Sequence, residues 1–458
     1  MVTDVATTQT VASAPSESTP SRFVRLPEIG VLALALLVRF TYVLAVRRDV
    51  AVLGDSYFYF YQGKALARGQ GFIIPFTWEL QHRAVQAADH PPIFPLFLAL
   101  LNKVGITSAV GQMLVNCVVG SITVLLIMLL SHAVAGRKTA LVAGAFAAVA
   151  PDMFSYDGFL LSETWAMALL VASALVLVRF LRTRRWPWAV ATGVSVGVVS
   201  LARAEFLMAV PLIGLYLLVT GVRAKRVRVS VLSAAIVGLT AVAVVSPWLA
   251  YNRSRFDQSV GMSVGLQFTL AVSNCDSVYF GPQAGYWDMK CIQGANERSA
   301  AANGDESMTA AEAFKDGADY IKAHPRRALQ MPFLRVGRVL GLYRPIQQAN
   351  LDVVPEGRER LVAFGGLGLW YLFAGLGVVG ARGLRRRGVT IFPLLLPGIV
   401  VVASVAITFG SVRYRAGFEP FICILAAAGV AEIVRGFRQI MATPIDSLTS
   451  TDSRPTAA

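Results

Sequence analysis

Apolar runs separated by polar turns recur along the chain from Ile29 to Val434. A helix crosses the hydrocarbon core of a bilayer in roughly 20 residues, and ten of the runs qualify or nearly qualify as such helices. The pattern therefore predicts an all-α polytopic membrane protein with a bundle of about ten transmembrane helices. We expect these helices at residues 29–46, 109–133, 139–154, 160–180, 186–201, 206–220, 229–250, 361–379, 389–409 and 418–434.

One further apolar stretch, residues 91–104, is an eleventh candidate span. Counting it would invert every later helix relative to the membrane. Its prolines at 91, 92 and 95 each lack a backbone donor, which favours an irregular entry. We therefore expect this stretch to dip into the outer leaflet without crossing.

Lysine and arginine residues gather in the turns that follow every second run. Cations near helix ends are retained on the cytoplasmic side, so this alternation predicts that both termini are cytoplasmic. Two large segments, residues 47–103 and 251–360, then face outward as loop regions with juxtamembrane helices. The cytoplasmic clusters are Arg22 and Arg25, Arg137 and Lys138, Arg182, Arg184 and Arg185, Arg223, Lys225, Arg226 and Arg228, Arg382 and Arg385–Arg387, and Arg435 and Arg438.

The composition agrees with a membrane protein. Of the 458 residues, 55% are hydrophobic and only 15% charged, and the mean hydropathy is +0.59. The net charge of +15 lies in short clusters between apolar runs, so we interpret it as contact with anionic lipids and not with nucleic acid. The sequence starts with a stretch rich in Ser, Thr and Ala, which is typical of a disordered tail and not of a signal peptide.

These patterns divide the chain into five parts. We expect a disordered cytosolic N-terminus at residues 1–25 and an N-terminal transmembrane module at 26–250, which includes the first outer loop at 47–103. An extracytoplasmic loop with amphipathic helices follows at 251–360. C-terminal transmembrane helices at 361–438 and a disordered cytosolic tail at 439–458 complete the chain.

Charged side chains at the outer rim of a membrane are costly and call for a functional hypothesis. Asp55 stands directly after the first span in an aromatic-rich segment. Its carboxylate is a candidate general base that takes a proton from an acceptor hydroxyl. The alternative is that Asp55 caps the segment that follows it.

Further acidic candidates stand at two other outer positions. Asp89 and His90 precede the proline-rich stretch, and Asp157 lies between the third and fourth spans. Glu163 lies just inside an apolar helix, where an uncompensated carboxylate is expensive and requires a partner. That partner is a metal ion, a substrate hydroxyl or an outer arginine, unless Glu163 simply stabilises the start of its helix.

Three arginines break the positive-inside pattern. Arg203 lies beside Glu205, and Arg413 and Arg415 precede the last span. Guanidinium groups bind phosphate oxygens in forked geometry, so a lipid-linked phosphate at the outer rim suits them. The alternatives are contact with lipid headgroups and pairing with Glu205 or Glu419.

The long loop at 251–360 adds three features. Residues 326–342 alternate cations with apolar residues at helical spacing, which predicts an interfacial amphipathic helix. It ends at Tyr343 and Arg344, two further candidate substrate-binding residues. Cys275 and Cys291 share the loop outside the membrane, which favours a disulfide over a metal site with His324.

Together these segments resemble the GT-C superfamily of glycosyltransferases, most closely the family 39 group of protein O-mannosyltransferases and the lipid A aminoarabinose transferase. The similarity covers about residues 26–434. It depends on the order of several motifs along one topology, namely Gly54-Asp55, His90-Pro91-Pro92-Ile93-Phe94-Pro95, Leu161-Ser162-Glu163, Leu201-Ala202-Arg203-Ala204-Glu205, Ser246-Pro247-Trp248 and Arg413-Tyr414-Arg415.

The resemblance implies a GT-C-like bundle and a polyprenyl-phosphate monosaccharide donor. Asp55 matches the family's acidic residue in the first outer loop and is expected to activate the acceptor for inverting in-line attack. Arg203, Arg413 or Arg415 would stabilise the phosphate leaving group, and Glu163 and Asp157 would orient hydroxyls.

The sequence departs from the family at two places. Many members carry an Asp-Glu pair where this chain has Asp55-Ser56, and the protein-mannosylating subgroup usually has an added soluble domain that is not seen here. Both departures favour a glycan or lipid acceptor, although a protein acceptor stays open.

The resemblance implies an enzyme in the plasma membrane with an extracytoplasmic active site. A divalent metal is possible, and no other cofactor is expected. The alternative functions are a lipid or sugar transporter and a scaffold for envelope assembly. Transporters place polar groups near the bilayer midplane at broken helices, whereas the polar candidates here gather at the outer rim.

Overall fold

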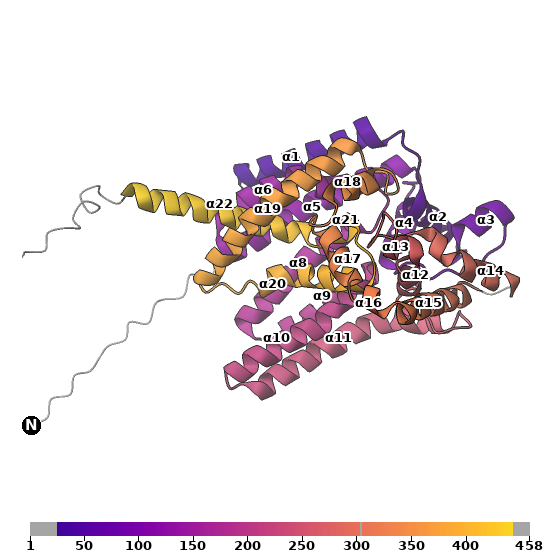
Figure 1. The fold of residues 1–458 in the computed structure, drawn as a ribbon. Helices are drawn as coiled ribbons and strands as arrows, with labels where there is room; N and C mark the ends of the chain where they lie inside the picture. The colour runs from indigo at the N-terminus through magenta and orange to yellow at the C-terminus, as the bar shows by residue number, and fades with distance from the viewer. Residues whose placement is uncertain (1–24, 303–304, 443–458) are drawn as a thin grey trace, which may run out of the picture.

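The computed structural model describes residues 25–302 and 305–442. Within these ranges the chain is helical, and its single β-bridge joins Ile73 and Gln86. The helices form a bundle, with a lobe of shorter helices at one end (Figure 1). The tails predicted at 1–25 and 439–458 lie almost wholly outside the described residues, although the last helix continues to Ala442.

The bundle has a helix on each of the ten apolar runs, and the third run is divided between two helices. Seven of the described helices, with their direct extensions, are long and apolar enough to cross a membrane, and eight if one bent pair counts as a single span. Two more, α9 and α20, are apolar but only 17 and 16 residues long. The all-α membrane fold is confirmed. The bundle helices are α1 (Leu26–Tyr42), α5 (Ala109–Ala135), α6 (Arg137–Val149), α8 (Glu163–Thr183), α9 (Trp186–Ala202), α10 (Ala209–Arg223), α11 (Val227–Arg253), α19 (Arg360–Arg386), α20 (Phe392–Ile407) and α22 (Glu419–Ala442).

The third predicted span, 139–154, is not a single helix. After α6 the chain bends by 63° into a second segment, Pro151–Gly158, which begins with the short helix α7 (Pro151–Phe154). Ala150 is extended, with ψ of 117°, because the ring of Pro151 disfavours helical backbone at the preceding residue. The bend turns Asp152 and Asp157 into the protein interior.

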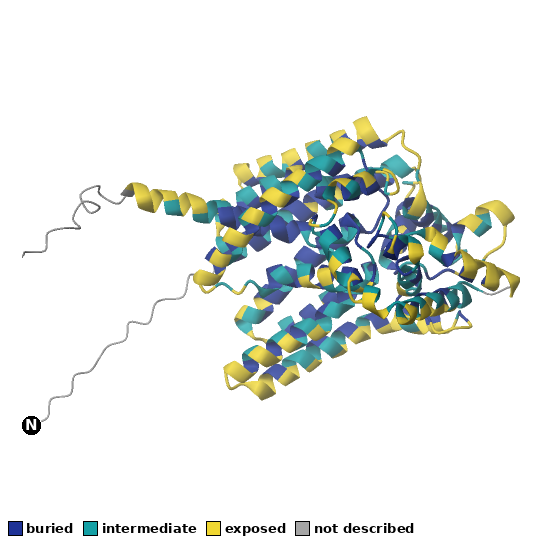
Figure 2. Ribbon diagram, viewed as in Figure 1, coloured by how far each residue is buried: buried dark blue, intermediate teal, exposed yellow. Residues whose placement is uncertain are grey.

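Small residues allow close packing inside the bundle. A Cβ atom on Gly193 of α9 would lie 2.5 Å from the carbonyl oxygen of Val237 on α11, and one on Gly197 would lie 2.7 Å from Val244. The outward faces of these helices expose Val194, Leu239 and Val242. Such surfaces suit contact with lipid, and Figure 2 shows exposed positions along the outside of the bundle.

The loop lobe, as we call the helices of 54–103 and 265–353, covers one end of the bundle. Arg255, in the segment between α11 and the second part of the lobe, binds the first part by donating to the carbonyl oxygens of Phe72 at 3.2 Å and Ala87 at 3.0 Å. The helices of the lobe are α2 (Gly54–Ala67), α3 (Pro75–Gln81), α4 (Ile93–Lys103), α12 (Gly265–Val272), α13 (Asp276–Tyr279), α14 (Gln293–Ala301), α15 (Glu306–Ala323), α16 (Pro325–Ala328), α17 (Met331–Val339) and α18 (Pro345–Val353).

The eleventh candidate span corresponds to α4, which has 11 residues. At 1.5 Å per residue it is about 16 Å long, roughly half the thickness of a bilayer core. It packs against α2, where a Cβ on Gly63 would lie 2.6 Å from Leu98. Its length therefore agrees with a stretch that does not cross.

The predicted amphipathic helix at 326–342 forms as α16 and α17, but two of its cations face inward. Arg335 and Arg338 are buried. Arg335 donates to the carbonyl oxygen of Ile407 at 3.1 Å, at the negative end of the α20 dipole. Leu329 and Phe333 are instead exposed at 75% and 79%. The helix is therefore not a simple interfacial one, because Arg335 is bound by main-chain carbonyls, and Arg338 by the Ala284 carbonyl and two glutamine side chains.

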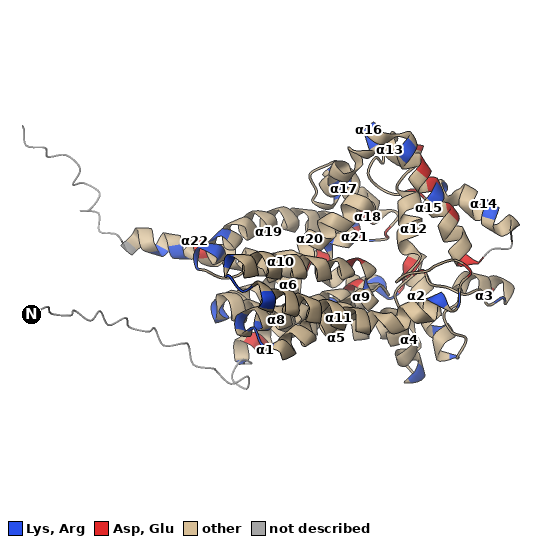
Figure 3. Ribbon diagram, turned by 90° about the horizontal axis from the view of Figure 1, so that it is seen from below, with Lys and Arg blue, Asp and Glu red and all other residues tan. Residues whose placement is uncertain are grey.

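The first testable prediction concerns topology. Lys and Arg residues gather at the end of the bundle where α1 begins and α22 ends, opposite the loop lobe (Figure 3). We expect a membrane-impermeant maleimide added outside intact cells to label Ala301→Cys and to spare Arg386→Cys, both exposed positions, in a background lacking Cys117 and Cys423. Labelling of the Arg386 position alone would contradict the orientation.

The second prediction concerns the disulfide that joins Cys275 and Cys291, whose Cα atoms lie 5.7 Å apart. Because the bond limits the freedom of the unfolded chain, we expect Cys275→Ser to lower the free energy of unfolding by about 2–4 kcal/mol. Denaturant unfolding in detergent measures this loss. Cys117→Ala, at a buried free cysteine, controls for thiol removal, and two free thiols in the unreduced wild type would contradict the prediction.

Candidate active site

Five charged side chains meet where the bundle adjoins the loop lobe. We call them the rim cluster: Asp55, Glu163, Arg203, Glu205 and Arg413. They come from the start of α2, the start of α8, the connection between α9 and α10, and α21 (Val412–Arg415). Residues up to 358 positions apart in sequence are thus joined by direct ion pairs.

Asp55 pairs with the loop that precedes the last span. Its Oδ2 lies 2.5 Å from Nη1 of Arg413, and the carboxylate keeps 41% of its surface exposed. Burial raises the pKa of Asp55, but the Arg413 guanidinium, helped by His90 and Arg203, outweighs burial and lowers the pKa to about 2. The N-cap residue of α2 is Leu53, so the capping alternative does not describe the contact that Asp55 makes.

Glu163 is the buried centre of the cluster. It is the first residue of α8, where the helix dipole stabilises a carboxylate, and its side chain is 0% exposed. Its Oε1 accepts from Nη1 of Arg203 at 2.7 Å and from Nε of Arg413. Its Oε2 has no hydrogen-bond partner, so one acceptor is left for a further donor. The outer arginines, one of the alternatives for its partner, pair with it.

Arg203 joins two carboxylates. Besides Glu163, it contacts Glu205, whose Oε1 lies 2.6 Å from its Nε. Glu205 is 16% exposed and is therefore the more accessible of the two. The cluster holds three carboxylates and two guanidinium groups, so each arginine is already paired.

Asp89 and His90 form a neighbouring pair beside Asp55. Nε2 of His90 lies 3.4 Å from Oδ2 of Asp89, and its ring stacks on Tyr59 with 4.4 Å between centroids. Burial raises the pKa of Asp89, His90 opposes this rise, and Asp55 adds to it. The pair thus acts electrostatically on Asp55.

Four other predicted site residues lie elsewhere. Asp157 pairs with Arg39 of α1 at 2.8 Å, and both are buried. Arg415 pairs with Glu419 at 2.5 Å, which is the alternative that its neighbour in sequence suggested. Tyr343 and Arg344 lie in the turn after α17, where Arg344 donates to the carbonyl oxygen of Pro282. The structure does not bring these four residues to the rim cluster.

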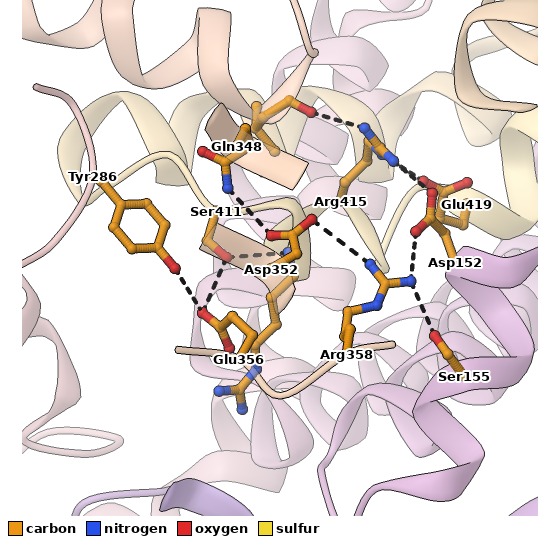
Figure 4. Close-up of polar contacts among 12 residues, drawn as sticks. Asp152, Ser155, Tyr286, Gln348, Asp352, Glu356, Arg358, Ser411, Arg415 and Glu419 are labelled. Atoms are coloured by element: carbon orange, nitrogen blue, oxygen red, sulfur yellow. Dashed lines mark hydrogen bonds and ion pairs between the residues drawn. The ribbon is translucent and has the colours of Figure 1, made fainter. Parts of the chain in front are cut away.

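The structure also reveals charged residues that the sequence analysis missed. Asp152, Asp352 and Arg358 are such residues, and they form an inner cluster with Arg415 and Glu419, which the sequence analysis named (Figure 4). Asp152 accepts from Arg358 at 2.7 Å and from Arg415 at 2.6 Å. Three residues of this region, Asp352, Glu356 and Arg358, stand directly before the span at 361–379. The criterion of charge at the outer rim, applied to that span, would have found them.

The sequence analysis left open whether a divalent metal ion binds at the site. Across residues 25–302 and 305–442, no three His, Cys, Asp or Glu side chains come together in an arrangement that could hold a metal ion. In the rim cluster the carboxylates are paired with arginines.

Comparison with known proteins gives a partial family match and a shared fold. Residues 89–251 match the family model described as dolichyl-phosphate-mannose-protein mannosyltransferase. Among curated protein sequences, none matches the chain.

The oligosaccharyltransferase AglB from Archaeoglobus fulgidus, in complex with an inhibitory peptide and a dolichol-phosphate, has a TM-score of 0.52 at 13% identity over 93% of this chain and 52% of that chain. A second structure of the Archaeoglobus fulgidus oligosaccharyltransferase, tethered to an acceptor peptide, has a TM-score of 0.51 at 14% identity. The match covers 95% of this chain and 53% of that chain. ArnT from Cupriavidus metallidurans in the apo state has a TM-score of 0.37 at 14% identity, and the match covers 89% of this chain and 77% of that chain.

The chain spans about half the length of the oligosaccharyltransferase structures that it resembles. At this level of identity the likeness shows the fold. The chain is therefore a multi-pass membrane protein with a GT-C-type fold, and its residues 89–251 match a mannosyltransferase family model.

Proposed function

We propose that the protein transfers a monosaccharide from a polyprenyl-phosphate donor to an acceptor outside the cytoplasm. The observation that carries the proposal is the rim cluster, in which a half-exposed carboxylate and two guanidinium groups meet at the end of a membrane bundle. A base for the acceptor and cations for a phosphate are the two parts that such a transfer requires.

In the proposed reaction Asp55 takes the proton of an acceptor hydroxyl. The hydroxyl oxygen then forms a bond to the anomeric carbon, while the bond from that carbon to the phosphate oxygen breaks on the opposite side. The sugar changes anomeric configuration, and the phosphate leaves with the electron pair. Arg203 and Arg413 stabilise this charge, a role typically worth about 3–4 kcal/mol for one well-placed donor.

The order of binding follows from the charges. A carboxylate with a pKa of about 2 is a weak base, because its guanidinium partner stabilises the ionised form. When the donor phosphate engages Arg413, that stabilisation falls and the basicity of Asp55 rises. We expect Glu205 to release Arg203 in the same step, since it is more exposed than Glu163. Donor binding thus prepares the base for the acceptor.

An apolar cavity supports a lipid-linked donor. It lies between α8, α9, α10 and α20, and its lining includes Leu170, Leu177, Val196, Phe206, Ile213 and Val400. Leu170 follows Glu163 by seven residues on α8, so the cavity begins about 10 Å below the rim cluster. Its free volume of about 30 Å³ is too small for a whole isoprenoid chain, but its apolar lining suits one part of such a chain. The AglB structure of the same fold is a complex with a dolichol-phosphate.

The predicted topology puts the rim cluster on the outer side of the plasma membrane. The acceptor is then a glycan, lipid or protein of the cell envelope. The transporter alternative has less support, because the charged residues at the broken third span, Asp152 and Asp157, are held in ion pairs.

The third prediction tests the base. We expect Asp55→Asn to lower the rate of sugar transfer by about 100-fold to 10,000-fold, because the amide cannot take the acceptor proton. Detergent stability and binding of the donor lipid should change little. The measurement is transfer by purified protein from synthetic undecaprenyl-phosphate sugars to an envelope extract.

The control for this prediction is Asp49→Asn, which removes another carboxylate of the first outer loop. Asp49 is 85% exposed and pairs only with its exposed neighbour Arg48 among the contacts of the structure, so its loss should leave transfer unchanged. Equal rates for Asp55→Asn and wild type would remove Asp55 from the mechanism.

A further inference from the structure

A small polar cavity separates the rim cluster from the inner cluster. It is lined by Arg413 on the rim side and by Asp352 and Arg358 on the inner side. Glu356, Tyr156, Phe159 and Leu161 complete the lining. Its free space accommodates about one water-sized group. The cavity therefore lies next to the proposed reaction centre but is too small for a whole sugar ring.

The polar groups of this cavity are incompletely paired. The Asp352 side chain is 4% exposed, yet its Oδ2 lies 3.9 Å from Nη1 of Arg358 and its Oδ1 accepts from Gln348 only at 3.3 Å. Nε of the buried Arg358 has no partner. Buried polar groups are normally hydrogen-bonded, so these atoms are available to an incoming polar group.

Glu356 also lines the cavity, and its hydrogen bonds are likewise weak. Its Oε1 accepts from Tyr286 at 3.2 Å and from Ser411 at 3.4 Å, and both contacts are long (Figure 4). Burial raises the pKa of Glu356, and Arg413 opposes the rise. Burial likewise raises the pKa of Asp352 to about 7, although Arg358 opposes it. A carboxyl group that titrates near neutrality can either donate to or accept from a hydroxyl group.

We infer that this cavity binds one hydroxyl group of the transferred sugar and thereby selects the donor. The inference rests on the proposed transferase activity. Arg413 borders both sites, so a sugar whose phosphate engages Arg413 has its ring beside the cavity mouth. Asp352 and Glu356 are specificity-determining residues in this assignment, and the donor class is a sugar with a free hydroxyl group at the position that reaches them.

The size of the cavity makes this selection strict. A site built to hydrogen-bond a substrate hydroxyl leaves its own buried groups unpaired when the hydroxyl is absent, and such sites reject the deoxy analogue strongly. The aromatic and aliphatic side chains of Tyr156, Phe159 and Leu161 close the remaining wall. A substituent larger than a hydroxyl group does not fit without displacing them.

The fourth prediction tests this assignment with monodeoxy donors. The wild type is first assayed with undecaprenyl-phosphate mannose, glucose and galactose, and then with each monodeoxy analogue of the best donor. We expect one analogue to lose about 100-fold or more in kcat/KM. In Glu356→Gln and Asp352→Asn the ratio of full donor to that analogue should fall to about 10-fold or less, because the mutation and the missing hydroxyl remove the same contact.

The control is Glu359→Gln, a carboxylate of the same loop that pairs with Arg47 at 2.9 Å and does not line the cavity. Glu359→Gln should keep the wild-type ratio of kcat/KM for the full donor to kcat/KM for the discriminated deoxy analogue. A purely structural role for Glu356 would lower both rates equally and leave the ratio unchanged, and that result would overturn the assignment while the proposed activity stands. Absence of transfer by the wild type from every donor would overturn the activity and the assignment together.

Discussion

The ion pairs of Arg413 are the interaction on which the arrangement of the site depends. One guanidinium group joins Asp55, at the start of the first outer helix, to Glu163, at the start of a bundle helix. A buried carboxylate without a partner is strongly destabilising, and Glu163 is 0% exposed. Arg413 shares Glu163 with Arg203, so the loop that carries Arg413 is held over the rim by the same buried carboxylate that anchors Arg203. The same pairing brings the candidate base beside the cations that suit a phosphate.

The inner cluster supports this loop from behind. Arg415 follows Arg413 by two residues and is held by Glu419 and Asp152. Gly410, just before the loop, packs so closely that a Cβ would lie 2.5 Å from the carbonyl oxygen of Arg335. The position of Arg413 is thus determined by the bundle on one side and by α17 on the other. Rigid support of this kind is what precise placement of a functional side chain requires.

Hydropathy and charge alternation were sufficient to predict the helices and most of the rim residues. The apolar runs became helices, the third with a bend, because a helix satisfies the backbone within a bilayer. The sequence also singled out Asp55, Glu163, Arg203 and Arg413 by the cost of charge at the rim. What it could not supply was the pairing, because contacts between residues as far apart as Asp55 and Arg413 depend on the packing of the whole bundle.

Some of the expected site and surface residues lie elsewhere, for local reasons. Asp157 and Arg415 carry charge at the rim like their neighbours, but Arg39 and Glu419 satisfy them, and no local pattern distinguishes the two situations. Arg335 and Arg338 follow the spacing of a surface helix, yet main-chain carbonyls of other segments bind them. The bend before Pro151 was readable in principle, since the residue before a proline avoids helical backbone.

The central claim is that the rim arginines bind the phosphate of a polyprenyl lipid. Binding of undecaprenyl phosphate and of uncharged undecaprenol to the protein in nanodiscs, compared for wild type, Arg203→Lys and Arg413→Lys, tests it most directly. The account predicts that each substitution weakens phosphate binding by about 10-fold to 100-fold, the usual worth of a hydrogen bond to a charged group, and leaves undecaprenol binding unchanged. Equal affinity of all three proteins for undecaprenyl phosphate would contradict it.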